Sequence, residues 1–141
     1  MFGNTYSNPA RAYARVEAET SVEAATPHQL IMMLYDGALM ALRTAGVAMQ
    51  NNDIPTKGLS ISKAIDIILN GLKVSLDVKA GGELAERLDA LYTYMAERLV
   101  YANANNSETA LNEVISLLDG LRDAWRTIGG TDKPAAEVPH V

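Results

Sequence analysis

The chain has 141 residues, a formal net charge of −5 and no cysteine, and 48% of its residues are hydrophobic although it has one Phe and one Trp. This length predicts one domain, and a composition rich in Ala and Leu predicts an all-α protein. The 12 Lys and Arg residues are scattered singly, which argues against nucleic acid or an anionic membrane as a partner. No uninterrupted apolar run approaches about 18 residues, and residues 1–8 lack the features of a signal peptide, so we expect a soluble cytoplasmic protein without membrane insertion.

Residues 1–25 are predicted to form a mobile N-terminal arm. Gly, Asn, Ser and Pro dominate residues 3–9, a composition that orders poorly by itself. The following segment is rich in Ala and Glu, and its larger apolar side chains, Tyr13, Val16 and Val22, are too widely spaced for a full amphipathic stripe. We therefore expect an arm that can dock on the rest of the domain.

A first helix is predicted over about residues 27–51. Thr26 and Gln29 form a capping box at its start. One narrow polar seam interrupts its otherwise apolar circumference and consists of Asp36, Arg43 and Gln50. A helix that is apolar nearly all round must be covered, so we expect the other segments to pack around it. The alternative is that part of its surface is reserved for a partner.

A second helix is predicted over about residues 56–79, after a turn at residues 51–55. It carries two apolar stripes: Ile61, Ile65, Ile68, Leu72 and Leu76 form one, and Ala64, Ile67, Gly71, Val74 and Val78 form the other. Together the stripes cover roughly 220° of the helix, against about 100° for an ordinary surface helix. This exceeds what one bundle core needs, and surplus apolar surface of this kind indicates an interaction site.

Two more helices are predicted, over about residues 83–103 and 108–128. Ala80, Gly81 and Gly82 are expected to separate the first of these from the preceding helix, and Tyr94 and Tyr101 lie off its inner face. The last helix has a single apolar stripe, ends at Gly129 and Gly130, and is followed by a disordered tail over residues 131–141. Residues 26–130 are therefore predicted to fold as an antiparallel up-down-up-down four-helix bundle.

The sequence offers little catalytic or cofactor chemistry. The sole Glu-x-x-His spacing, Glu137 to His140, lies in the tail with Pro139 inside it, which argues against a di-iron site. His28 stands in the first helical turn, where a solvated role is expected. Gly-rich phosphate loops are absent, and no nucleophile can be paired with a base. We predict that the protein is not an enzyme and has no metal, cofactor or catalytic site.

The chain resembles the flagellar secretion chaperone FliS family between about Tyr13 and Ile128. The resemblance is carried, in order and at family-like spacing, by residues 12–13, 27–31, 33–38, 63–68, 71–72, 81–83, 91–95, 98–99, 102–103 and 123–125. It implies a cytoplasmic, four-helix chaperone of type III flagellar export. Such a chaperone binds the disordered C-terminal segment of flagellin, prevents its premature polymerisation and helps deliver it to the export apparatus. The resemblance also implies that the arm around Tyr13 takes part in client binding.

We therefore expect an amphipathic client segment to fold onto the apolar surface of the first and second predicted helices, with further contact from the third. The candidate partner-binding residues are Tyr13, Ile31, Tyr35, Leu39, Ile67, Gly71, Val74, Val78, Tyr94 and Tyr101. The expected partners are the flagellin C-terminal segment and components of the flagellar export apparatus, and the free protein is expected to be a monomer or weak homodimer. The alternative is a structural helical bundle that uses its surplus stripe to associate with itself and has no client.

Overall fold

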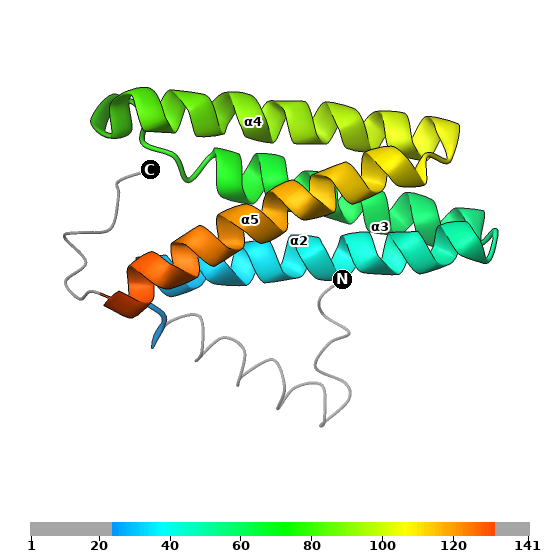
Figure 1. Ribbon diagram of the computed structural model, residues 1–141, viewed down its shortest axis with the longest axis horizontal. Coiled ribbons are helices and arrows are strands. Elements are labelled where there is room, and N and C mark those ends of the chain that lie inside the picture. The colour runs from blue at the N-terminus through cyan, green and yellow to red at the C-terminus, as the bar shows by residue number, and fades with distance from the viewer. Residues whose placement is uncertain (1–23, 132–141) are drawn as a thin grey trace, which may run out of the picture.

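Four long helices pack together in the computed structural model, which describes residues 24–131 (Figure 1). The elements are α2 (Pro27–Gln50), α3 (Ile54–Ile67), the π-helix η2 (Ile68–Lys73), α4 (Val78–Asn105) and α5 (Glu108–Thr131). Consecutive long helices run in opposite directions, and α5 runs diagonally from the end of α4 to the start of α2. The all-α, four-helix prediction is confirmed. Most of the predicted arm, residues 1–23, and residues 132–141 of the predicted tail lie outside the described residues.

The predicted capping box sets the start of α2. The Gln29 backbone N–H donates to Thr26 Oγ1 over 3.1 Å, and the Thr26 backbone N–H donates to Gln29 Oε1 over 2.9 Å. After α2 the chain turns through Asn52, whose φ of 56° lies in the left-handed region that Asn tolerates. Asp53 then caps α3 by accepting from the Thr56 N–H over 3.2 Å. This cap begins the helix at Ile54, two residues earlier than the sequence pattern predicts.

The second predicted helix ends earlier than expected, at Lys73 and not at Lys79. Its last six residues form the π-helix η2, in which the ladder of α-helical hydrogen bonds is already broken. The Ser75 hydroxyl donates to the Gly71 carbonyl over 2.5 Å, and the Leu76 N–H donates to the Lys73 carbonyl over 3.1 Å. These two bonds close a turn, and residues 74–77 separate η2 from α4.

The next helix begins at Val78 and not at residue 83, because Asp77 caps it by accepting from the Ala80 N–H over 3.0 Å. The predicted break at the glycines is a kink inside α4, at Gly82, whose φ of 59° and ψ of −137° are not helical. Gly82 can adopt this backbone because it has no Cβ. At the other end α4 continues two residues beyond the prediction, and Asn106 ends it in the left-handed conformation.

The helix α5 continues through Gly129 and Gly130 to Thr131. The sequence predicted that these two glycines end the helix at about residue 128. Gly129 is required by a close approach: His28 of α2 lies directly against its Cα, so that a side chain there would collide with the imidazole. The same ring bonds the Trp125 carbonyl through Nε2 and lies 5.8 Å from the Trp125 ring centroid. These contacts hold the end of α5 on the start of α2, as Figure 1 shows.

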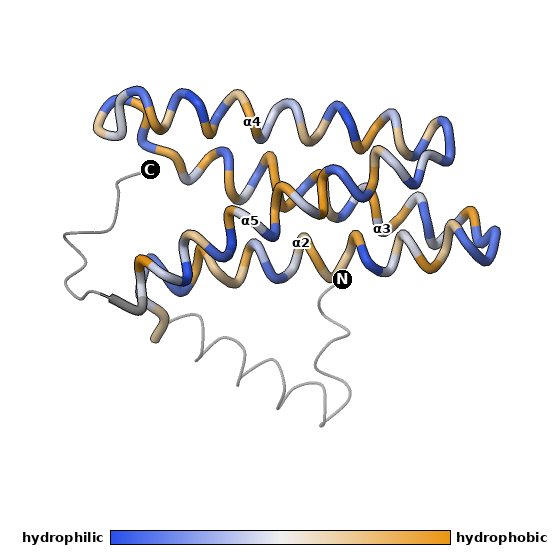
Figure 2. Tube along the Cα trace, viewed as in Figure 1, coloured by the Kyte–Doolittle hydropathy of each residue, from blue (hydrophilic) through white to orange (hydrophobic). Residues whose placement is uncertain are grey.

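The core is formed by the inner faces of all four helices. Its largest fully buried side chains are Tyr35, Leu42, Ile61, Ile68, Leu72, Met95, Leu99, Leu111, Val114 and Leu118. Hydrophobic residues recur along every helix at the spacing that such a core needs (Figure 2). The helix α2 packs mainly against α3 and α5, while α4 packs against η2, α5 and α3. Thus α2 is flanked by two helices and not surrounded, contrary to the expectation that the other segments pack around it.

By length and composition α2 is also apolar enough to cross a membrane, a test that the core helices of soluble bundles pass as well. Its apolar residues are divided between the core and the surface. Eight of its residues are buried in the bundle, Ile31, Met32 and Leu34 are half-buried against the core, and Leu30, Met33, Met40 and Val47 are exposed on its outer side. The outer side is therefore the place to look for a partner-binding surface.

Candidate partner-binding surface

The outer side of α2 carries a continuous stripe of apolar and small residues. We call it the α2 face and define it as Leu30, Met33, Gly37, Met40, Thr44 and Val47. These positions alternate three and four apart, so they share one side of the helix over about 26 Å. All but Gly37 are exposed, and 70% of the Met40 surface is open to solvent. This spacing is typical of a stripe that packs against another helix, and no helix within residues 24–131 covers it.

Close packing against α3 and η2 forms one edge of the α2 face. A Cβ built on Gly37 would lie 3.4 Å from Ile67 Cδ1, and one built on Gly71 would lie 3.0 Å from Leu34 Cδ2. Gly71 therefore allows α2 to approach η2 closely, whereas the space at Gly37 corresponds to ordinary contact with α3. Beyond η2, Val74 and Val78 are exposed apolar residues at the turn into α4.

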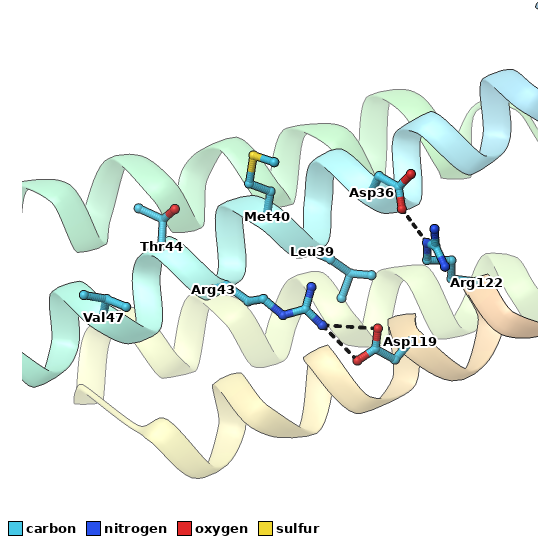
Figure 3. A pocket seen from close by; sticks show the side chains of 8 residues that line it. All are labelled: Asp36, Leu39, Met40, Arg43, Thr44, Val47, Asp119 and Arg122. Carbon is cyan, nitrogen blue, oxygen red and sulfur yellow. Dashed lines mark hydrogen bonds and ion pairs between the residues drawn. The ribbon is translucent and has the colours of Figure 1, made fainter.

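An open hollow of about 790 Å³ forms the opposite edge, between α2 and α5 (Figure 3). Its lining consists of Asp36, Leu39, Met40, Arg43, Thr44, Val47, Asp119 and Arg122. Half of the α2 face thus also borders this hollow. The buried Leu39 gives the hollow an apolar base between the two helices.

Two ion pairs cross the hollow and set its polar rim. Arg43 Nη2 lies 3.2 Å from Asp119 Oδ2, and Arg122 donates from Nε to Asp36 Oδ1. The bond to Asp36 raises the pKa of the Arg122 guanidinium above its ordinary value. Pairs this exposed add little to stability. Their effect is to hold charged groups at the side of an apolar surface, as the polar rim of a protein interface does.

A second cluster joins aromatic and charged side chains on α4 and α5. The Tyr94 hydroxyl donates to Glu113 Oε2, Arg98 Nε donates to Glu113 Oε1 over 2.8 Å, and the Arg98 guanidinium lies 4.9 Å from the Tyr101 ring centroid. The pKa of Glu113 is lowered mainly by the hydrogen bond from Tyr94 and, to a smaller extent, by the one from Arg98. The hydrogen bond between Tyr94 and Glu113 also raises the pKa of Tyr94. Tyr94 and Tyr101 are both exposed, and their contacts with Glu113 and Arg98 fix the positions of their rings at the surface.

The structure places two predicted contact residues in the core, which corrects their assignment to a free surface. Tyr35 is fully buried, and its hydroxyl lies 2.5 Å from that of Tyr92, which is also buried. Burial raises the pKa of both hydroxyls. Leu39 is buried at the base of the hollow. These side chains point inward because the first helix turns its Tyr35 and Leu39 side toward α4 and α5, a choice that the apolar pattern alone leaves open.

The other predicted residues fall into three groups. Val74, Val78, Tyr94 and Tyr101 are exposed; Ile31, Ile67 and Gly71 are half-buried at the edge of the core; and Tyr13 lies outside the described residues. Ile67 and Gly71 border the α2 face, whereas Tyr94 and Tyr101 belong to the cluster between α4 and α5. The structure therefore gathers the helical candidates at two separate places.

Sequence reasoning missed Met33, Met40 and Val47 as contact candidates. A signal for them existed: each follows a polar residue of the outer side of α2 by four positions, namely Gln29, Asp36 and Arg43. Positions four apart on a helix are neighbours, so apolar residues beside a solvent-facing seam are themselves exposed. Within residues 24–131 the structure contains no group of three or more His, Cys, Asp or Glu side chains that could hold a metal ion.

Comparison with known proteins places these surfaces in context. The model of the family described as "Flagellar protein FliS" matches residues 9–132. The flagellar secretion chaperone FliS of Salmonella typhimurium is 48% identical over 118 residues, which cover 84% of this chain and 87% of that protein. The Escherichia coli protein of the same name is 47% identical over 116 residues, covering 82% and 85%. That of Bacillus subtilis is 37% identical over 119 residues, covering 84% of each chain.

Proposed function

Because the chain belongs to the FliS family of flagellar secretion chaperones, we propose that its client is the disordered C-terminal segment of flagellin and that the α2 face is its main docking surface. The family is non-enzymatic, so the activity is binding itself. The observation that carries the location is the uncovered apolar stripe on a helix whose other sides are packed. We place the activity in the cytoplasm, where flagellin is held before export.

The α2 face suits an amphipathic segment that becomes helical on binding. Apolar client side chains would lie between Met33, Met40 and Val47, while polar client groups would meet the ion pairs at the rim of the hollow. Ordering a disordered segment costs about 2–5 kcal/mol, which wide apolar contact offsets. A client held in this way cannot polymerise through the same segment, and its release needs competition by the export apparatus and no ATP hydrolysis by this protein.

A longer client segment would extend beyond the α2 face. Val74 and Val78 continue the apolar surface past Ile67 and Gly71, and we include all four in the proposed contact region. Tyr94 and Tyr101 would receive a second part of the segment, on the other side of α5. We assign Tyr35 and Leu39 the role of supporting α2 from beneath, because neither is open to a partner.

Titration calorimetry with a synthetic peptide of about 40 residues from the flagellin C-terminus tests this proposal. We expect one-to-one binding with a negative heat-capacity change, because apolar surface is buried. Met40→Asp should weaken binding by about tenfold or more, since it places a charge in the middle of the contact. Val100→Asp is the matched control: it also introduces Asp at an exposed apolar position, on α4 and away from the α2 face.

Three results would count against the proposal. An absence of binding by the unaltered protein removes flagellin as the client. Equal weakening by Met40→Asp and Val100→Asp removes the α2 face as the docking surface. A stable dimer of the free protein that Met40→Asp converts to monomer would favour the self-associating bundle, and light scattering of both proteins measures this directly.

A further inference from the structure

The methionines of this protein differ sharply in exposure. Met40 is 70% exposed and Met33 is 41% exposed, whereas Met49 is 4% exposed and Met95 is fully buried. Met32 is half-buried against the core. Both exposed methionines belong to the α2 face and stand seven residues apart on the same side of the helix. The most accessible thioethers among the described residues therefore lie in the middle of the proposed client surface.

We propose that Met40 and Met33 form a reversible oxidation site through which peroxides weaken client binding; this inference rests on the proposed function of the α2 face. The thioether sulfur attacks one oxygen of hydrogen peroxide, forming the S–O bond as the O–O bond breaks. The sulfur loses two electrons, and the departing hydroxide takes the proton of the transferred oxygen and leaves as water. The product is methionine sulfoxide, which a thiol-dependent methionine sulfoxide reductase converts back to the thioether.

Oxidation at these positions affects the complex more than the fold. In the free protein the new oxygen of Met40 is solvated, because most of the side chain is open to water. In the complex the same oxygen would be covered by apolar client side chains without a hydrogen-bond donor. Burying an unpaired polar group in this way corresponds to about a tenfold loss of affinity. The thioether also loses the flexible apolar character for which Met serves on binding surfaces.

The buried methionines provide an internal comparison. Met49 and Met95 lie in the close-packed core, so an oxidant reaches them only when the bundle opens. Limited peroxide should therefore modify Met40 first and Met33 second, and should leave Met49 and Met95 unmodified while the protein remains folded. Selective chemistry at the client surface follows from the order of exposure alone.

The test uses the full chain, treated with hydrogen peroxide that is removed before the flagellin peptide is added. Peptide mapping by mass spectrometry measures sulfoxide at each methionine, circular dichroism checks the fold, and calorimetry measures peptide affinity before oxidation, after it, and after treatment with methionine sulfoxide reductase. We expect affinity to fall about tenfold at full oxidation of Met40 and to return after reduction. The Met33→Leu, Met40→Leu variant keeps apolar side chains but cannot form the sulfoxides, and its affinity should not respond to peroxide.

Each outcome decides between the possibilities. If the unoxidised protein does not bind the peptide, the proposed function fails and not only this inference. If it binds, but oxidised Met40 leaves the affinity unchanged, the oxidation site is refuted while the chaperone function stands. If the double Leu variant loses affinity on oxidation as the unaltered protein does, the relevant methionine is a different one, and the inference is likewise overturned.

Discussion

The buried hydroxyl pair of Tyr35 and Tyr92 offers the sharpest test of how this bundle is held together. The two oxygens lie 2.5 Å apart between α2 and α4. Both side chains are buried, so each hydroxyl satisfies the other. This hydrogen bond links two helices inside the core.

The single and double Phe variants should not be additive. Tyr92→Phe and Tyr35→Phe each leave one buried hydroxyl without its partner, and each should cost about 1–2 kcal/mol of unfolding free energy. The double variant removes both hydroxyls and leaves neither unpaired. It should therefore cost less than the sum of the two single losses, with a coupling energy of about 1 kcal/mol or more.

Urea denaturation followed by circular dichroism at a helix wavelength measures these free energies, and an unchanged denaturant slope would show that the variants unfold in the same way. Strictly additive losses would refute the reasoning, because they would mean that the two hydroxyls do not satisfy each other. Peptide affinity is a second readout. Since Tyr35 is inaccessible, Tyr35→Phe should leave affinity unchanged under conditions where the protein is folded, whereas a direct contact would lose it.

The pair also predicts a pH dependence. Burial raises the pKa of both hydroxyls, so the folded protein retains protons that the unfolded chain releases above pH ~10. Because the native state then binds more protons, stability should fall as the pH rises through this range. The double Phe variant should lack that part of the fall, and urea midpoints measured between about pH 8 and pH 11 would detect the difference.

Two further predictions concern polar groups at the ends and edges of the helices. Lys57 is buried and donates from Nζ to the Asn103 carbonyl over 3.1 Å at the end of α4. Lys57→Met should therefore lower the free energy of unfolding, measured by urea denaturation, by about 1–2 kcal/mol. The control Lys63→Met, at an exposed position, should lower it by less than about 0.5 kcal/mol. The hydrogen bond from Tyr94 lowers the pKa of Glu113 below its ordinary 4.5, so the native state binds fewer protons than the unfolded chain and the associated stability is lost as the pH falls through the folded pKa. Glu113→Gln should flatten the stability curve on this acid side only, and an unchanged curve would show that the bond does not form in solution.

The helices could be predicted from the sequence because their start signals are local. Thr26 and Gln29 form the capping box that the sequence indicated, and Ser107 accepts from the Ala110 N–H over 3.1 Å at the start of α5. The end of the second helix could not be predicted in the same way. Asp77 caps a new helix, and the turn that precedes it is closed by the Ser75 hydroxyl bonding the Gly71 carbonyl. The sequence alone does not show whether the helix continues past Lys73 or these local bonds end it. In the structure the end coincides with a contact between helices, because η2 brings Gly71 against Leu34 of α2.

The glycines show the same division between local and long-range causes. At Gly82 the backbone itself requires glycine, since its φ is positive. At Gly129 and Gly71 the backbone is ordinary, and the requirement comes from a side chain on α2, His28 in one case and Leu34 in the other. In the sequence alone, each of the three glycines indicates a possible helix break. Only the tertiary structure distinguishes a kink from a close approach between helices.

The sequence predicted surplus apolar surface on the first helix, but two of the contact candidates chosen there, Tyr35 and Leu39, are buried, and the reason is geometric. The amount of apolar arc on a helix follows directly from its amino-acid sequence, so the surplus on α2 is a local property of that segment. Which part of the arc faces inward depends on where the neighbouring helices lie, and α2 turns Tyr35 and Leu39 inward and Met33, Met40 and Val47 outward. The single fixed reference is the charged seam: Asp36 and Arg43 must reach solvent, and both bond α5 at its edge. Apolar residues next to that seam share its exposure, so the polar residues of a nearly apolar helix locate its exposed apolar side better than the apolar ones do.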